Sequence, residues 1–237
     1  NRYDLVIIGS GPGGYVAAVR AAQLGLKTAC VEKWPRLGGV CLNVGCIPSK
    51  ALLDSSEYFH LAKAQLASHG ITTGAVSMDV AKMMARKEQV VKDLTDNVKK
   101  LLENHKVVIL QGTARLAGKN RIAVDSAGKT ETIEADNIIL ATGSAPVAPA
   151  GLAFDGKTIL SSTEILKLDA VPGRLGIVGG GYIGLELGSV WLRLGSQVTV
   201  IELLPEIASS MDGQVRRRLQ SLLKTHPGPG LERADFL

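Results

Sequence analysis

The sequence predicts an α/β fold made of two Rossmann-like units with parallel sheets, and two observations carry this prediction. First, residues 5–8 form a short, continuous apolar run, followed by a glycine-rich turn and an alanine-rich helical stretch. Such a run is typical of a strand buried on both faces of a parallel sheet. Second, the same order recurs over residues 175–202. A repeated strand–glycine–helix–strand order indicates two β-α-β units in one chain.

The first unit is expected to contain a helical insertion and a small β-meander. A helix that begins after the first glycine-rich turn ends at Gly25, because glycine readily adopts the left-handed conformation that closes helices. The other expected elements are a strand at 27–32, helices at 47–68 and 78–104, a strand at 107–110, a hairpin of 121–124 with 131–133 around the turn 126–129, and a buried strand at 137–143.

The second unit is expected to be partial. Its elements are a strand at 175–178, a helix to residue 194, a strand at 197–202 and a helix at 212–224. Proline and glycine punctuate the chain between the two units and again after the last helix. We therefore expect a first nucleotide-binding domain over 1–148, a connector over 149–172, a partial second domain over 173–225 and an irregular tail over 226–237.

Composition excludes several classes of function. The net charge is +5 and aromatic residues make up only 4% of the chain, which argues against a nucleic-acid surface. No apolar run approaches the roughly 18 residues that a membrane helix needs, and no signal or transit peptide is visible. Three cysteines are too few for a disulfide scaffold. A reducing compartment is expected.

The glycine motif Gly-x-Gly-x-x-Gly occurs twice, each time after an apolar strand and at the start of a helix. In that context the glycines allow a tight turn, and the helix N-terminus offers N–H donors to a pyrophosphate. Two dinucleotide sites are expected, at Gly9, Gly11 and Gly14 and at Gly179, Gly181 and Gly184.

An acid follows each motif at the end of the next strand. Glu32 follows Gly14, and Glu202 follows Gly184, at the same interval along the chain. An acid at this place in a β-α-β unit can bind the ribose of a dinucleotide. The equal placement of the two acids supports both predicted sites.

Glu202 also predicts which dinucleotide the second site takes. A 2′-phosphate about 4 Å from its carboxylate would be repelled by about 4 kcal/mol at a surface-like dielectric. No arginine follows closely to offset that charge. NAD is therefore favoured over NADP.

Cys41 and Cys46 form a candidate redox pair. The loop that a disulfide between them would close is short, so the bridge would stabilise the fold little and suits reversible chemistry better. Two buried apolar cysteines, or half of a zinc site, are the alternatives. No further Cys-x-x-Cys or histidine pair is near enough to complete a metal shell, so no metal site is expected. Cys30, within an apolar strand, is expected to be an inert core thiol.

Together, the two nucleotide motifs and the segment 38–50, Gly-Gly-Val-Cys-Leu-Asn-Val-Gly-Cys-Ile-Pro-Ser-Lys, resemble the class I pyridine nucleotide-disulfide oxidoreductases, which are flavoproteins. Within them, Leu42-Asn43 and Ile47–Lys50 are most similar to the dihydrolipoamide dehydrogenase branch. The resemblance runs from about residue 3 to about residue 224.

The resemblance implies that the first site holds FAD and the second holds NAD. Cys41 would be the interchange thiol, and Cys46 the charge-transfer thiolate nearer the flavin. Lys50 and Glu186 match the family's ion pair beside the flavin, and Tyr182 matches an aromatic that covers it. The full set of cofactor residues implied is Gly9, Gly11, Pro12, Gly13, Gly14, Glu32, Lys33, Gly39, Val40, Cys41, Cys46, Lys50, Ala114, Ala141, Thr142, Gly143, Ser144, Gly179, Gly181, Tyr182, Ile183, Gly184 and Glu202.

By the same resemblance, the activity would be oxidation of protein-bound dihydrolipoamide by NAD, within cell redox homeostasis. The partners would be lipoyl domains of 2-oxo acid dehydrogenase or glycine-cleavage complexes, and a second copy in a homodimer. The family's dimerisation domain and its His–Glu base are not found in the sequence, so the chain is expected to be truncated. The alternatives are a catalytically inactive nucleotide-binding fragment and another NAD(P)H-dependent disulfide or mercuric reductase. A cytoplasmic location, or the mitochondrial matrix after removal of a transit peptide, is expected.

Overall fold

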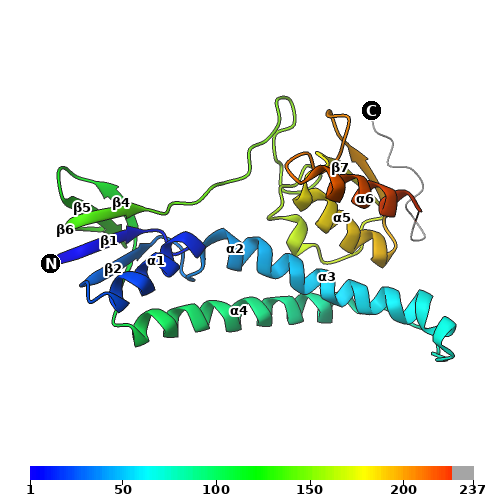
Figure 1. The fold of residues 1–237 in the computed structure, drawn as a ribbon, viewed down its shortest axis with the longest axis horizontal. Coiled ribbons are helices and arrows are strands. Elements are labelled where there is room, and N and C mark those ends of the chain that lie inside the picture. Colours follow the sequence, from blue (N-terminus) through cyan, green and yellow to red (C-terminus); the bar gives the residue numbers. More distant parts are fainter. Residues whose placement is uncertain (226–237) are drawn as a thin grey trace. The chain divides into compact units, whose positions relative to one another are not determined.

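The computed structural model describes residues 1–225, which form two compact units (Figure 1). Unit 1 contains Asn1–Pro48 and Gln89–Val147, and unit 2 contains Ser49–Glu88 and, among the described residues, 148–225. Each unit therefore combines two separate stretches of the chain. The division into domains expected from the sequence stays a prediction, and the expected irregular tail lies outside the described residues.

Unit 1 is built on one six-stranded sheet, which confirms the predicted α/β class. Its strand order is β3-β2-β1-β6-β5-β4. The first four strands in that order are mutually parallel, whereas β5 is antiparallel to both of its neighbours. The strands are β1 (Arg2–Ile8), β2 (Thr28–Glu32), β3 (Val108–Gln111), β4 (Thr113–Leu116), β5 (Arg121–Ser126) and β6 (Lys129–Leu140).

The prediction of a separate strand over 137–143 was wrong. Strand β6 is continuous, because its first half pairs antiparallel with β5 while its second half pairs parallel with β1. Polar residues at the junction between the two halves bind residues of β1. Asp136 forms an ion pair with Arg2, and Asn137 donates to the carbonyl of Asp4 at 3.3 Å. An Asp-Asn pair that looks like a strand break is therefore part of the ladder.

Helices cover one face of the parallel strands in unit 1. Side chains of α1, α2 and the end of α4 pack there against Leu5, Ile7 and Cys30. On the other face, Val6, Ile8, Ala29 and Val31 pack against apolar residues of β5 and β6. The sheet therefore folds over itself, which buries both faces of β1. These helices are α1 (Pro12–Gln23), α2 (Gly39–Val44) and α4 (Val80–Asn104), of which the part from Gln89 on belongs to unit 1. Helix α3 (Cys46–His60) belongs to unit 2 from Ser49 on.

Two of these helices differ from expectation. Helix α2 was not predicted, since it has only six residues and lies between glycines. Helix α3 ends as a regular α-helix at His60, and a π-turn (Leu61–Gln65) and a 3-10 turn (Leu66–His69) complete the stretch that was predicted to be helical. None of the helices in the described part of the chain is long and apolar enough to cross a membrane.

Unit 2 repeats the beginning of unit 1. It contains a 3-10 turn (Ile165–Lys167), β7 (Arg174–Val178), α5 (Tyr182–Leu194), β8 (Gln197–Ile201) and α6 (Gly213–Thr225), with β7 parallel to β8. A core cluster joins α3, α4 and α5 through Leu52, Met83, Leu187 and the fully buried Trp191.

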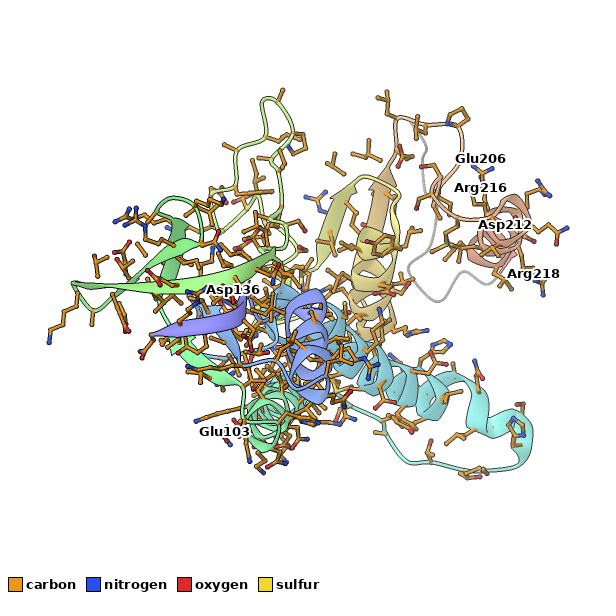
Figure 2. The ribbon with its side chains drawn as sticks, turned by 60° about the vertical axis from the view of Figure 1, so that its left-hand side comes forward. Glu103, Asp136, Glu206, Asp212, Arg216 and Arg218 are labelled. Atoms are coloured by element: carbon orange, nitrogen blue, oxygen red, sulfur yellow. The ribbon has the colours of Figure 1, made fainter. Side chains whose placement is uncertain are left out.

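Polar contacts fix the start of α6, and Figure 2 labels three of the residues that make them, Glu206, Asp212 and Arg216. The carboxylate of Asp212 accepts a hydrogen bond from the backbone N–H of Gln214 at 2.8 Å. This satisfies one of the donors that a helix N-terminus leaves unpaired. One turn further on, Arg216 forms an ion pair with Glu206 at 2.9 Å. The helix predicted over 212–224 is thereby confirmed as α6.

Candidate functional site

The first glycine motif is a turn between β1 and α1 that admits no side chains at two positions. Gly9 has a φ of +104°, and a Cβ built there would overlap the carbonyl of Ala141. A Cβ on Gly14 would overlap the carbonyl of Gly9. A Cβ on Gly13, by contrast, would have nothing within 4 Å among the described residues. The turn is therefore closed on the protein side and open on the other.

Glu32 lies beside this turn, at the end of β2, and holds it by hydrogen bonds. Its buried carboxylate accepts from the backbone N–H of Ser10 at 2.9 Å, from the Ser10 hydroxyl at 2.5 Å and from the N–H of Trp34 at 2.8 Å. A carboxylate has about four acceptor positions, so capacity remains for a ligand hydroxyl. Ser10 was not among the predicted site residues. The only signal for it is its place between two motif glycines.

The segment that leads to the cysteines is bound to the same turn. The N–H of Gly38 donates to the carbonyl of Ser10 at 3.0 Å and lies 3.2 Å from its hydroxyl oxygen. Gly39 passes so close that a Cβ on it would be 2.7 Å from the Cα of Gly11. Both Gly38 and Gly39 have positive φ. Two stretches that are separate in sequence thus form one surface.

Cys41 and Cys46 lie on two successive helices next to this surface. Cys41 is half-buried on α2, and Cys46 is exposed as the first residue of α3. Gly45 joins the helices, and a Cβ on it would be 2.9 Å from the carbonyl of Val40. The tight turn therefore requires a glycine, a residue that sequence reasoning had not singled out. The helix expected from residue 47 thus begins one residue earlier, at Cys46.

Cys30 has a different environment from the other two cysteines. It is fully buried on β2, and its thiol lies 3.8 Å from the carbonyl of Gly9. Burial, and to a smaller extent the charge of Glu32, raise the pKa of Cys30 to about 12. Such a thiol is protonated at neutral pH and is a poor nucleophile.

The second glycine motif has the same geometry at the corresponding positions. Gly179 has a φ of +105°, and a Cβ on Gly184 would be 2.9 Å from the carbonyl of Gly179. Glu202 accepts from the N–H of Gly180 at 2.6 Å and of Leu204 at 2.8 Å. Hydrogen bonds from Leu204 and then Gly180 lower the pKa of Glu202. The Glu202 carboxylate therefore stays charged. Its hydrogen bonds fix the second turn, just as the hydrogen bonds of Glu32 fix the first.

A bidentate ion pair joins α3 and α5 in unit 2. The Lys50 ammonium lies 2.7 Å from both carboxylate oxygens of Glu186, and the two side chains are 57% and 32% exposed. Tyr182 precedes Glu186 by one turn of α5, is 54% exposed, and so lies on the same side of that helix.

The remaining predicted residues lie at the ends of elements or on open surfaces. Pro12 begins α1, Val40 lies on α2, Ile183 on α5, and Gly181 precedes α5 as its cap. Ala114 pairs with Val124 across β4 and β5. Lys33 follows β2, and Thr142, Gly143 and Ser144 are exposed after β6. The structure thus brings the glycine turn, Glu32, Gly39 and Ala141 together in unit 1, and Gly179–Gly184 with Glu202 in unit 2.

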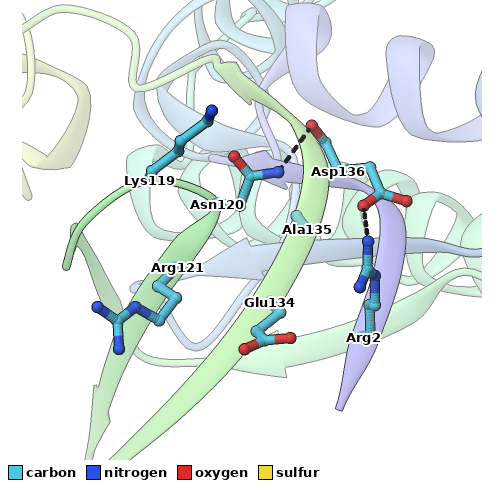
Figure 3. A pocket seen from close by; sticks show the side chains of 7 residues that line it. All are labelled: Arg2, Lys119, Asn120, Arg121, Glu134, Ala135 and Asp136. Atoms are coloured by element: carbon cyan, nitrogen blue, oxygen red, sulfur yellow. Dashed lines mark hydrogen bonds and ion pairs between the residues drawn. The ribbon is translucent and has the colours of Figure 1, made fainter.

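A small pocket of about 230 Å³ lies elsewhere in unit 1 (Figure 3). It is at the start of β1, whereas the glycine turn follows the end of that strand, so the pocket is separate from the candidate nucleotide site. Among the described residues, no cluster of histidine, cysteine or acidic side chains is placed to hold a metal ion. The pocket is lined by Arg2, Lys119, Asn120, Arg121, Glu134, Ala135 and Asp136.

Comparison with known proteins finds a matching family model and similar sequences. The profile of a family described as "Pyridine nucleotide-disulphide oxidoreductase" matches residues 3–228. The chain is 54% identical over 226 residues to a dihydrolipoyl dehydrogenase of Trypanosoma brucei brucei, covering 94% of this chain and 47% of that protein. It is 47% identical over 224 residues to a mitochondrial dihydrolipoyl dehydrogenase of Sus scrofa, covering 93% and 44%. The chain thus spans about half the length of the curated relatives it matches.

A solved structure has the same fold over the same extent. The flavoprotein disulfide reductase RclA of Escherichia coli, described as HOCl-induced, superposes with a TM-score of 0.77 at 29% sequence identity. The match covers 94% of this chain and 47% of that one. The fold described above is therefore found in a flavin-containing relative.

Proposed function

The chain belongs to the pyridine nucleotide-disulphide oxidoreductase family, and from this premise we propose that it supplies the FAD site, the redox disulfide and part of the NAD site of a dihydrolipoyl dehydrogenase. The observation that carries the proposal is the contact between the cysteine segment and the first glycine turn. Gly38 and Gly39 dock on Ser10 and Gly11. A nucleotide bound at this turn would therefore lie against the chain that leads into Cys41.

Members of the family use FAD and NAD, and the residues of this chain fit both. In unit 1, Gly9 and Gly14 keep the turn tight and the open side at Gly13 leaves room for a pyrophosphate. The start of α1 has no side-chain cap. Pro12 has no N–H and the N–H of Gly14 donates to the carbonyl of Gly11 at 2.8 Å, so the N–H of Gly13 is the donor of this first turn that can serve an anion. In unit 2, α5 also begins without a side-chain cap, beside Glu202. We assign FAD to the first turn and NAD to the second.

Cys41 and Cys46 carry the thiol chemistry in this proposal. A thiolate of the substrate dithiol attacks the Cys41 sulfur of the Cys41–Cys46 disulfide, forms a mixed disulfide and releases Cys46 as thiolate. The second substrate thiolate then displaces Cys41 and closes the substrate disulfide. FAD bound at the first turn would supply an acceptor for the electron pair of the reduced cysteines, and NAD bound at the second turn would supply the final hydride acceptor.

In the proposal, Lys50 supplies a positive charge that Glu186 holds in place. Tyr182 is the third residue of this group. Lys50 follows Cys46 by one turn on the same helix. A lysine held by a carboxylate can stabilise negative charge that develops nearby. Glu186 keeps the ammonium in one position by binding it with both oxygens. Tyr182 lies on the same side of α5 as Glu186, and we assign it the role of the covering aromatic that the family resemblance implies.

The substrate in the proposal is protein-bound dihydrolipoamide, presented by lipoyl domains of a 2-oxo acid dehydrogenase or glycine-cleavage complex, and the working protein is a homodimer. Curated relatives carry the name dihydrolipoyl dehydrogenase, which supports this choice. Another disulfide reductase that uses NADPH is the alternative within the family. It is disfavoured because the charged Glu202 would meet the 2′-phosphate.

The proposal is tested by comparing the chain with its Cys46→Ser variant. Purified chain should bind FAD stoichiometrically, and dihydrolipoamide should reduce the bound flavin, a half-reaction that does not need the complete NAD site. Cys46→Ser should lower the rate of this half-reaction by about a thousand-fold or more, because cysteines that act as a unit cannot be removed singly without losing the reaction. Cys30→Ala, at a buried thiol on the same sheet, is the matched control and should keep the rate within about two-fold.

The outcomes separate the proposal from its rivals. A chain that binds no flavin, or a Cys46→Ser variant with normal flavin reduction, contradicts the proposal. A chain that binds both nucleotides but does not oxidise dihydrolipoamide is a catalytically inactive nucleotide-binding fragment, which is the alternative function. A preference for NADPH identifies another reductase of the family.

A further inference from the structure

Helices α3 and α5 are joined by two ion pairs with the same spacing. Lys50 binds Glu186 at 2.7 Å, and Arg193 binds Glu57 at 2.5 Å. The second pair follows the first by the same interval on each helix (57 − 50 = 193 − 186). That interval is close to two helical turns, so both pairs lie along one side of each helix. The helices run in the same direction where the pairs form.

The second pair was not anticipated, and its cation is the less exposed of the two cations. The side chain of Arg193 is only 28% exposed and that of Glu57 is 43% exposed. Arg193 also lies 3.5 Å from the hydroxyl of Ser56. Because the guanidinium is planar and contacts two neighbouring residues of α3, it constrains the orientation of the Arg193 side chain as well as its distance from α3.

Apolar packing between these helices does not by itself fix how far one is shifted along the other. The shared core consists of aliphatic side chains such as Leu52, Leu187 and Val190, with Trp191. Cores tolerate exchange of apolar side chains when total volume and pattern are kept, and they lose a unique arrangement before they lose stability. A displaced arrangement could therefore bury a similar area.

The order of charges does distinguish the observed arrangement from displaced ones. On α3 the cation comes first and the acid second, whereas on α5 the acid comes first. A shift by about two turns one way would place Lys50 opposite Arg193, and the other way would place Glu57 opposite Glu186. Both shifts bring like charges together, which is unfavourable.

We propose that Glu57 and Arg193 are positioning residues that set the register of α3 against α5 and thereby hold the Lys50 ammonium at Glu186. The role of Lys50 beside a flavin rests on the proposed function. The register itself rests only on contacts within unit 2. Glu57 and Arg193 act through Lys50 and have no contact with a reacting atom.

A third contact on α3 provides an internal comparison. Arg86 of α4 forms an ion pair with Asp54 at 2.6 Å and donates to the carbonyl of Ala51 at 3.1 Å. This contact stabilises α3 against a different helix. Its loss weakens unit 2 without favouring like-charge pairs between α3 and α5.

The test measures how well Lys50 is protected, in the full chain without added FAD. The rate of acetylation of Lys50 is followed by peptide mass spectrometry in four variants: Glu57→Arg, Arg193→Glu, the double swap of both, and Asp54→Asn. Each single reversal should raise the Lys50 rate by about two- to five-fold, the range of a partly exposed ion pair. The double swap, which restores opposite charges at the second pair, should return the rate to within about two-fold of the parent.

The swap and the Asp54→Asn variant decide the outcome. A double swap that labels as fast as the single variants overturns the proposal. So does Asp54→Asn labelling as fast as Glu57→Arg, because general loosening would then explain the effect. If the double swap does not fold, Arg193→Lys and Arg193→Gln replace it, and equal labelling in these two also overturns the proposal.

A second readout links the register to the proposed function without measuring turnover. In chain loaded with FAD, single reversals should shift the reduction potential of the flavin, and the double swap should restore it. Failure of FAD to bind would contradict the proposed function while leaving the labelling result valid. Restored labelling with an unshifted potential would overturn only the link to the flavin.

Discussion

At the scale of single residues, one hydroxyl-bearing side chain connects three parts of unit 1. Ser10 is fully buried. It donates to Glu32 and accepts from Gly38, so the glycine turn, the end of β2 and the cysteine segment share one residue. A buried polar group left without a partner costs about 1–3 kcal/mol. The cost explains why all of these groups are paired.

Cys30 gives a prediction about pH. With a pKa near 12, only about one Cys30 thiol in ten thousand is ionised at pH 8. In the reduced native chain, iodoacetamide should therefore modify the exposed Cys46 readily and leave Cys30 unmodified from pH 7 to pH 9. Alkylation in denaturant, where burial is lost, should modify all three cysteines. Native labelling of Cys30 at the rate seen for Cys46 would contradict the environment described here.

At the scale of elements, the turn of the β5–β6 hairpin contains an alanine in a backbone conformation that alanine disfavours. Ser126 pairs with Lys129, so Ala127 and Gly128 form a two-residue loop. Both have positive φ, +47° and +79°, as in the type I′ turns that suit the twist of a hairpin. Glycine adopts this conformation freely, whereas alanine does so at a cost of about 1–2 kcal/mol.

Replacing Ala127 should therefore stabilise the protein. Ala127→Asn should raise the free energy of unfolding by about 0.5–1 kcal/mol, because asparagine tolerates the left-handed region and favours this turn. Urea denaturation measures the change. The control is Ala145→Asn, at an exposed alanine without positive φ, which should change stability by less than about 0.5 kcal/mol. No gain from Ala127→Asn would mean that the turn is not strained at this residue.

At the scale of the whole molecule, the chain uses one β-α-β design twice. The strand register agrees between the two copies, since Leu5 lies opposite Thr28 and Leu175 opposite Val198. Leu175 follows Leu5 by the same number of residues as Val198 follows Thr28. Each copy belongs to its own compact unit, so damage to one glycine turn should remain local.

Gly14→Ala and Gly184→Ala test that independence. A Cβ on Gly14 would overlap the carbonyl of Gly9, and a Cβ on Gly184 would lie 2.8 Å from Ile177. Overpacking of this kind displaces the turn. A displacement that costs about 1–3 kcal/mol of binding free energy corresponds to roughly a 5- to 150-fold loss of affinity. Gly14→Ala should weaken FAD and spare NADH, and Gly184→Ala should do the reverse.

Binding is measured by titration of each nucleotide followed by fluorescence. Gly74→Ala is the matched control, because a Cβ there would have nothing within 4 Å among the described residues. It should change neither affinity by more than about two-fold. Loss of both affinities in one variant would show that the two units depend on each other.

The sequence by itself determined what depends on neighbours along the chain. Strands β1, β2, β7 and β8, the long helices and both glycine turns follow from apolar runs, helical spacing and glycine, whose effects are local. The acids Glu32 and Glu202 could be placed because the β-α-β unit has a nearly fixed length.

Tertiary structure alone decided what depends on partners distant in sequence. The continuity of β6 depends on pairing with β1, the first strand of the chain. The role of Ser10 depends on Gly38 passing beside it, and that of Arg193 on Glu57, which belongs to a much earlier helix. Such hydrogen bonds and ion pairs leave no periodic pattern in the sequence. Their partners are distant along the chain and are brought together by burial of the core rather than by local conformational preference.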